Sequence, residues 1–152
     1  ANDPVLMSLE PIISPLRPAS IRLVNAWETL FDPWPMTFES AKGHAHERGE
    51  AVFAMAAQLA DVPFDREVAS AARLWALADL ALHCSDPDIA AGLMDVAGSY
   101  VGSAKKVSRD LLPFGILTRF AERDVQRGIS NRIATGSLRH IGEAFGLFLG
   151  FN

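Results

Sequence analysis

The segment 74–86, with the sequence LWALADLALHCSD, constrains the fold of this chain more than any other stretch. Its residues are apolar almost throughout, which predicts a buried helix. Asp79, His83 and Asp86 are spaced i, i+4 and i+7, so they lie on one face of that helix. A polar stripe on a buried helix either lines a cavity or is satisfied by partners at the helix end. The function that the sequence predicts depends on which of these holds.

Length, composition and charge limit the classes of protein to which the chain can belong. With 152 residues, of which 49% are hydrophobic and 21% are charged, it fits one globular domain spanning residues 1–152. The net charge of −4 and the scattered basic residues argue against a nucleic-acid partner. The single Cys84 excludes an intrachain disulfide, and no apolar run reaches the roughly 18 residues of a membrane span. We therefore expect a cytoplasmic domain without a transmembrane segment.

Helix is the predicted structure along almost the whole chain. Alanine, leucine and charged residues dominate, and no alternating strand pattern with a hairpin turn occurs. Prolines, glycines and capping residues set the boundaries, with Thr37 as one expected N-cap. We expect an all-α, single-domain bundle of about six to seven helices, at about 4–13, 18–31, 37–60, 65–83, 87–101, 113–127 and 129–149.

The sequence offers only weak signals for a metal site or a catalytic nucleophile. His46 and Glu50 are four residues apart, but zinc sites take three or four ligands, and no H-E-x-x-H or C-x-x-C pattern occurs. A solvated helix face is the better interpretation of this pair. Cys84 follows His83, and neighbours on a helix point apart, so we expect a buried thiol. We predict no metal site.

Two of the polar residues in segment 74–86 have structural explanations. Asp86 precedes Pro87, which is the pattern of an N-cap followed by proline at the first helical position. Asp79 lies mid-helix among apolar residues, where a carboxylate needs a partner. That partner is Arg73, His83 or an arginine from another helix. A position on a cavity wall stays open as the alternative role for Asp79.

Several segments together resemble the squalene/phytoene synthase family, and in particular its divergent bacterial members. These are segments 48–54 (RGEAVFA), 71–80 (AARLWALADL), 86–87 (DP), 112–117 (LPFGIL) and 121–125 (AERDV). The resemblance covers nearly the whole chain and rests on a pattern of small and apolar helix positions. It places the chain against the C-terminal half of a family member.

The resemblance implies an isoprenoid-synthase-like helical fold. Members of the family condense two prenyl diphosphates head to head. Two aspartate-rich motifs hold the magnesium that neutralises the leaving diphosphate, and an apolar cavity shelters the carbocation from water. The first of these motifs has no counterpart in this chain. The second normally reads Asn-x-x-x-Asp-x-x-x-Asp, and Asp79, His83 and Pro87 stand at those positions.

Proline cannot bind magnesium, and histidine is a poor ligand for that cation. We therefore expect a non-catalytic relative without a cofactor. The resemblance implies that its helical cavity binds an isoprenoid or another lipid, or that its surface holds a partner protein, as in the family's assembly-factor branch. The residues predicted to line the cavity are Phe53, Trp75, Asp79, His83 and Asp86.

Two other hypotheses stay open. In the first, the chain is a magnesium-dependent prenyltransferase whose missing aspartates come from an upstream segment or from a second chain. In the second, it is an unrelated helical interaction module that uses Trp27, Trp34 and Phe38 as an exposed anchor.

The end of the chain is rich in apolar residues. We expect this surface to pack on the domain. A second subunit, as in a homodimer, and the surface of a membrane are the alternatives, although the lysine and arginine face of an interfacial helix is missing. The residues concerned are Ile141, Phe145, Leu147, Phe148, Leu149 and Phe151.

Overall fold

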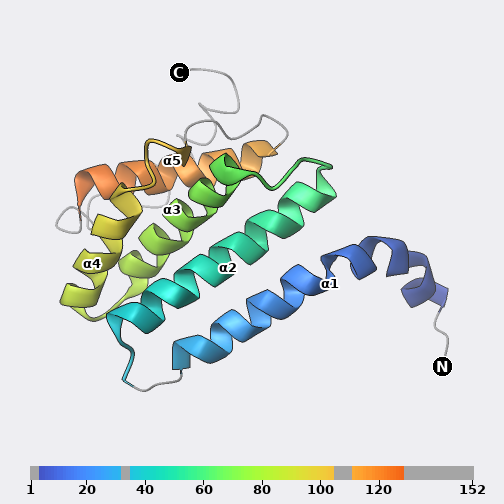
Figure 1. Cartoon of the computed structure of the whole chain (residues 1–152), viewed down its shortest axis with the longest axis horizontal. Helices are drawn as coiled ribbons and strands as arrows, with labels where there is room; N and C mark the ends of the chain where they lie inside the picture. Colours follow the sequence, from blue (N-terminus) through green and yellow to red (C-terminus); the bar gives the residue numbers. More distant parts are fainter. Residues whose placement is uncertain (1–3, 32–34, 105–110, 129–152) are drawn as a thin grey trace.

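Five α-helices make up the parts of the chain that this computed structural model describes, which are residues 4–31, 35–104 and 111–128 (Figure 1). These parts contain no strand, so the predicted all-α class is confirmed for them. The helix expected at 129–149 lies outside the described residues. The helices are α1 (Pro4–Phe31), α2 (Phe38–Leu59), α3 (Arg66–His83), α4 (Pro87–Gly98) and α5 (Leu112–Arg127).

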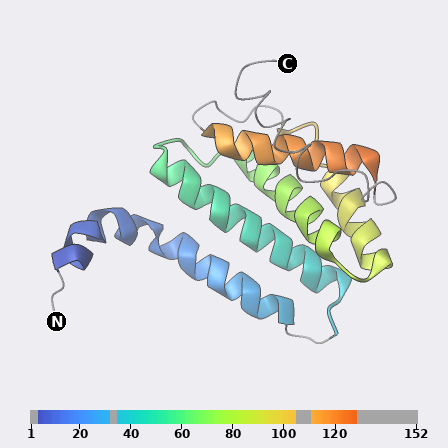
Figure 2. The ribbon, with the colours of Figure 1, turned by 180° about the vertical axis from the view of Figure 1, so that it is seen from behind.

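The first helix differs from the prediction of two helices at about 4–13 and 18–31. Pro4–Phe31 is one helix of 28 residues, with Pro11, Pro15 and Pro18 inside it. A proline removes one backbone hydrogen bond and clashes with the preceding turn, and a helix can answer by bending instead of ending. Figures 1 and 2 show the N-terminal part of α1 bent away from the rest of the helix. Residues 7–15 of this part are exposed, so water can serve the unbonded carbonyls.

Local capping chemistry sets the starts of three helices close to the predicted positions. Thr37 and Ser40 form a capping box at the start of α2, in which each side chain accepts a hydrogen bond from the other residue's backbone N–H. Asp65 caps α3, and Asp86 caps α4 with Pro87 at its first position. The expected caps at Thr37 and Asp86 are therefore confirmed.

The helices form a layered bundle around α3. Helices α1 and α2 run antiparallel as a hairpin, and both views show them side by side (Figures 1 and 2). Helix α2 packs on α3, and α3 packs in turn on α4 and α5. No helix among the described residues is long and apolar enough to cross a membrane.

Small residues allow α2 and α3 to approach closely. A Cβ atom on Gly49 would lie 2.5 Å from the backbone oxygen of Ala72, so only glycine fits at this crossing. The largest fully buried side chains of the described residues are Phe53, Leu74, Leu77, Leu93 and Leu111, together with the imidazole of His44.

Helix α1 contributes little to this core. Ala26 is its only residue classed as buried among those whose side chains are described. Most of its large apolar side chains are at least 40% exposed, unlike those of the other helices. These exposed side chains are Met7, Leu9, Ile12, Ile13, Ile21, Val24 and Trp27.

Candidate functional site

Asp79 forms an ion pair with an arginine from another helix, which is one of the partners that the sequence predicted for it. The Arg48 Nη2 of α2 donates to the Oδ2 of Asp79 on α3 over 2.6 Å. The Arg48 side chain is 14% exposed and the Asp79 side chain 33%, so the pair is half-buried. The guanidinium of Arg48 also lies over the ring of Trp75, 5.1 Å from its centroid. The Asp79 carboxylate therefore ties α3 to α2.

His83 and Asp86 serve the two helix ends that flank the turn after α3. The Nδ1 of His83 lies 2.8 Å from the carbonyl oxygen of Asp79, and a protonated Nδ1 donates to it at the end of α3. The Oδ1 of Asp86 accepts from the backbone N–H groups of Asp88 and Ile89, at 2.9 and 3.1 Å. Both side chains are exposed. Helix termination accounts for both positions.

The carboxylates in segment 74–86, which the resemblance aligns with a magnesium motif, do not fit a magnesium site. The Asp79 carboxylate is held by Arg48, and the carboxylate of Asp86 caps α4. Within residues 4–31, 35–104 and 111–128, no group of three or more histidine, cysteine, aspartate or glutamate side chains could hold a metal ion. Magnesium needs several oxygen ligands that converge on one point, and these side chains do not supply them.

Phe53 and Trp75 pack in the core between α2, α3 and α5. Phe53 is fully buried, and its ring meets the ring of Phe114 edge-on at 4.8 Å between centroids. The centroid of the Trp75 ring lies 5.8 Å from that of Phe53. The guanidinium of Arg48 also contacts the Trp75 ring. The structure thus joins Phe53, Trp75 and Asp79 in one continuous set of contacts through Arg48.

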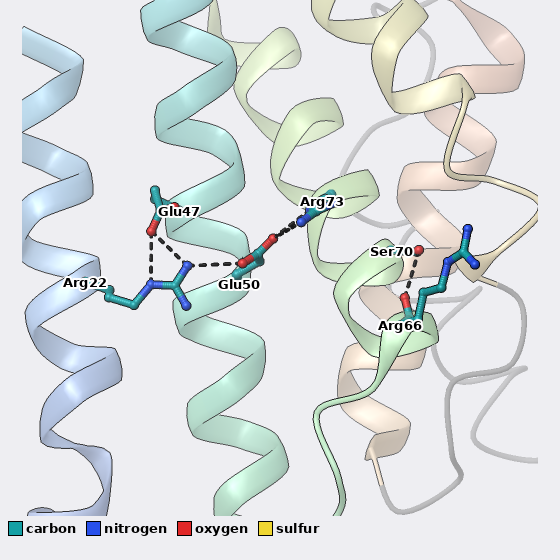
Figure 3. A network of polar contacts seen from close by, with 6 residues as sticks. All are labelled: Arg22, Glu47, Glu50, Arg66, Ser70 and Arg73. Atoms are coloured by element: carbon teal, nitrogen blue, oxygen red, sulfur yellow. Dashed lines mark hydrogen bonds and ion pairs between the residues drawn. The ribbon is translucent and has the colours of Figure 1, made fainter.

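Glu50 lies at the centre of an ion-pair network that joins three helices (Figure 3). Its Oε1 accepts from the Nε of Arg73 on α3 over 2.6 Å, and its Oε2 accepts from the Nη2 of Arg22 on α1 over 3.1 Å. Arg22 also binds Glu47 at 2.8 Å. The side chain of Glu50 is 15% exposed. The sequence-based expectation of a solvated face for His46 and Glu50 is therefore wrong, because α1 and α3 cover this side of α2.

Electrostatics keep Glu50 charged in the network. Burial by itself disfavours the carboxylate, but the hydrogen bonds from Arg73 and Arg22 outweigh it, so the pKa of Glu50 is lowered. Each charge of Glu50, Arg22 and Arg73 has a partner within the network. The network therefore holds helices together and offers no unpaired charge to a ligand.

Two histidines of α2 face neighbouring elements. His44 is fully buried, and its Nδ1 lies 2.6 Å from the carbonyl oxygen of Ala26 on α1. Burial lowers the pKa of His44, and burial likewise lowers the pKa of His46, whose ring meets that of Tyr100 at 6.0 Å. The neutral Nδ1–H of His44 donates to α1, so this imidazole contributes to seating α1 on α2.

Two of the three residues in the alternative hypothesis of an aromatic anchor have different surroundings in the described part of the chain. Trp27 is 46% exposed, and its ring meets the buried imidazole of His44 at 4.9 Å. Phe38 packs against the core, with the ammonium of Lys42 5.3 Å from its ring centroid. Trp34 lies outside the described residues.

An apolar hollow lies between α1, α2 and the start of α5, and we call it the α1–α2–α5 groove. It encloses about 480 Å³, which falls in the range of small-molecule sites, about 300–1,000 Å³. Its lining contains no charged side chain. The lining residues are Leu16, Val52, Met55, Ala56, Leu59, Ala60, Leu111, Pro113 and Phe114.

A second groove of about 530 Å³ lies at the turn after α2 and has a more mixed lining. Gln58 and Asp61 line it beside Val62 and Phe64. None of the five residues predicted to line a cavity borders either groove. The second half of α2 is apolar almost all round in the sequence, and one side of it faces the α1–α2–α5 groove.

Comparison with protein-family models, with curated proteins and with solved structures gives no match for this chain in any of the three. The resemblance to squalene/phytoene synthases therefore stays a prediction from the sequence.

Proposed function

We propose that this chain is a non-catalytic helical binding protein whose α1–α2–α5 groove takes a linear apolar chain, of the isoprenoid or fatty-acyl type. The observation that carries the proposal is the composition of the groove. Its walls are apolar side chains contributed by three helices, and it is open to solvent on one side. Removing apolar ligand surface from water contributes about 25 cal/mol for each Å² buried.

The lining of the groove also determines which ligands it can distinguish. No charged or amide side chain borders it, so a diphosphate, carboxylate or hydroxyl head group would stay in solvent. We therefore expect affinity to follow the length of the apolar chain and to change little with the head group. A prenyl-transfer site has to bind the diphosphate itself.

The polar residues of segment 74–86 support a non-catalytic role. Asp79 is bound by Arg48, His83 lies against the end of α3, and Asp86 caps α4. The sequence resemblance adds the choice of an isoprenoid ligand and the expectation that this bundle corresponds to the C-terminal half of an isoprenoid-synthase-like fold. A longer chain or a second subunit would be needed to complete a pair of aspartate-rich motifs.

Binding can be tested with a fluorescent fatty acid and its displacement by geranylgeraniol. The test variant is Leu59→Glu, and the matched control is Val24→Glu. Leu59 lines the groove and is 64% exposed, whereas Val24 lies on α1 away from it and is 59% exposed, so neither change creates a buried charge. We expect Leu59→Glu to weaken binding at least tenfold and Val24→Glu to change it less than twofold. Equal effects of the two variants, or no binding by the native chain, would refute the proposal.

The proposed lack of catalytic activity is tested separately. Incubation of the chain with farnesyl diphosphate and magnesium should give no condensed hydrocarbon or cyclopropyl product. Turnover that disappears in Asp79→Asn would instead support the prenyltransferase hypothesis, with the remaining ligands supplied by a second copy.

A further inference from the structure

We propose that the C-terminal end of this chain, residues 141–151, is an internal occupant of the α1–α2–α5 groove and competes there with the apolar ligand. The competition rests on the proposed function, whereas the docking of the segment does not. Three features of the molecule support the docking: the apolar surface around the groove, the length of chain that follows α5, and the composition of that chain.

The apolar surface extends past the groove along α1. Leu9, Ile12 and Ile13 precede the groove residue Leu16 by seven, four and three positions, so they share its helix face. These three side chains are 40%, 53% and 41% exposed, and Leu59 at the end of α2 is 64% exposed. The N-terminal part of α1 bends away beyond the end of α2 (Figures 1 and 2), so α2 covers little of this surface. An apolar surface of this kind marks an interaction site.

The chain after α5 is long enough to reach the groove. Leu111, Pro113 and Phe114 border the groove at the start of α5, whereas residue 129 follows its other end. The 16 residues of α5 span about 24 Å at a rise of 1.5 Å per residue. Phe145 lies 17 positions beyond Gly128 and Phe151 lies 23 beyond it, which is about 26–35 Å even at a helical rise. An extended chain reaches further.

The composition of this segment matches an uncharged apolar groove. Glu143 is the single charged residue in 141–152, and three of the nine phenylalanines of the chain fall within 145–151. Ile141, Phe145 and Phe148 are spaced i, i+4 and i+7, which is the anchor spacing of a helix that docks into a groove.

Connection through α5 favours this segment over a second copy. A tethered segment acts at an effective concentration of the millimolar order, which exceeds the concentration of any second copy in a micromolar solution. The segment therefore occupies its own groove before a second copy does.

The docking is tested by disulfide formation in the full chain, in a Cys84→Ser background that removes the native thiol. The test pair is Leu59→Cys with Phe148→Cys, and the control pair is Val24→Cys with Phe148→Cys. We expect the test pair to oxidise within the monomer at least tenfold faster than the control pair. Equal rates would overturn the docking, and a crosslinked dimer as the main product would assign the groove to a second copy instead.

The competition is tested by ligand affinity in Phe148→Asp, with Leu138→Asp, three residues before the segment, as the control. We expect Phe148→Asp to tighten binding of the fluorescent fatty acid three- to tenfold and Leu138→Asp to leave it within twofold. Rapid oxidation of the test pair without ligand binding in any variant would refute the proposed function and leave the docking standing. Ligand binding that is equal in all variants, together with equal oxidation rates, would refute the docking alone.

A membrane surface is the other destination for this segment. If full-length chain floats with phosphatidylcholine vesicles, if Phe148→Asp abolishes the flotation, and if the test pair oxidises no faster than the control pair, the segment binds lipid bilayers and the proposal is wrong.

Discussion

The guanidinium of Arg48 and the carboxylate of Asp79 meet across the α2–α3 interface, with 2.6 Å between Nη2 and Oδ2. Arg48 is the more buried partner, and it also lies against the ring of Trp75. A carboxylate in the middle of an apolar helix thus has a role that requires neither substrate nor metal. The pair fixes the rotation of α3 relative to α2, because both side chains must point into the same interface.

Removing the carboxylate should destabilise the fold more than an ordinary surface change. Asp79→Ala leaves the guanidinium of Arg48 half-buried without its anion, and we expect a loss of about 1–3 kcal/mol in the free energy of unfolding. Urea denaturation followed by circular dichroism measures it. The control is Asp95→Ala at an exposed position of α4, where we expect less than about 0.5 kcal/mol. If the two variants lose the same free energy of unfolding, the ion pair does not stabilise the fold.

Features that depend on residues close together in the sequence could be predicted. Features that depend on how two helices are rotated against each other could not. The caps at Thr37 and Asp86 follow from side chains that bond backbone groups two or three residues away. The partner of Asp79 was limited to an arginine from another helix or to two nearby residues. Choosing Arg48 needs the rotation of α2 against α3, which no local pattern contains.

In two of the wrong predictions, the surroundings of a segment overrode its local sequence pattern. Three prolines predicted a break in the first helix, yet α1 bends and continues, because an exposed helix can lose backbone hydrogen bonds to water. The polar pair of His46 and Glu50 predicted a solvated face, yet arginines from α1 and α3 cover Glu50. The α1–α2–α5 groove was missed for a similar reason, since it arises where three helices meet at one end of α2.

Neutralising Glu50 should weaken the packing of α1, α2 and α3 together. Glu50→Gln keeps the size of the side chain but removes the charge that Arg22 and Arg73 share, and we expect a loss of about 1–3 kcal/mol. The matched control is Glu47→Gln, because Glu47 is 52% exposed and pairs with Arg22 alone, and an exposed pair contributes at most about 1 kcal/mol. Thermal unfolding compares them, and a larger effect for Glu47→Gln would contradict this assignment.

Acid should lower stability in two separate ranges. The pKa of His44 is lowered in the folded chain by burial, so the unfolded chain binds more protons below its ordinary pKa of about 6.5 and stability falls as the pH decreases from there. The pKa of Glu50 is also lowered in the fold, so its contribution is present above the ordinary pKa of about 4.3 and is lost as the pH falls further.

Substitutions separate the two ranges. His44→Asn keeps an N–H donor near the carbonyl oxygen of Ala26 but does not titrate, so it should reduce the loss of stability that begins near pH 6.5. The part of this loss that comes from His46, whose pKa burial also lowers, should remain. Glu50→Gln should flatten the loss that begins near pH 4.3 and leave the first unchanged. His83→Asn is the control for histidine removal, because that side chain is 76% exposed. Urea midpoints measured at half-unit intervals from pH 8 to pH 3 give both slopes. An unchanged slope in His44→Asn would mean that His44 does not resist protonation in the folded chain.

Two glycines of α2 should respond to alanine in opposite directions. A Cβ on Gly49 would lie 2.5 Å from the backbone oxygen of Ala72 and 2.8 Å from the Cβ of Ala76, so α2 and α3 must separate to admit a methyl group. We expect Gly49→Ala to cost about 1–3 kcal/mol. A Cβ on Gly43 meets nothing within 4 Å, and Gly43→Ala should raise stability by about 0.5–1 kcal/mol because alanine is the better helix former. Urea denaturation of both variants tests the α2–α3 crossing directly. Since helix propensity alone would stabilise both, a gain in Gly49→Ala would show that the two helices do not approach this closely.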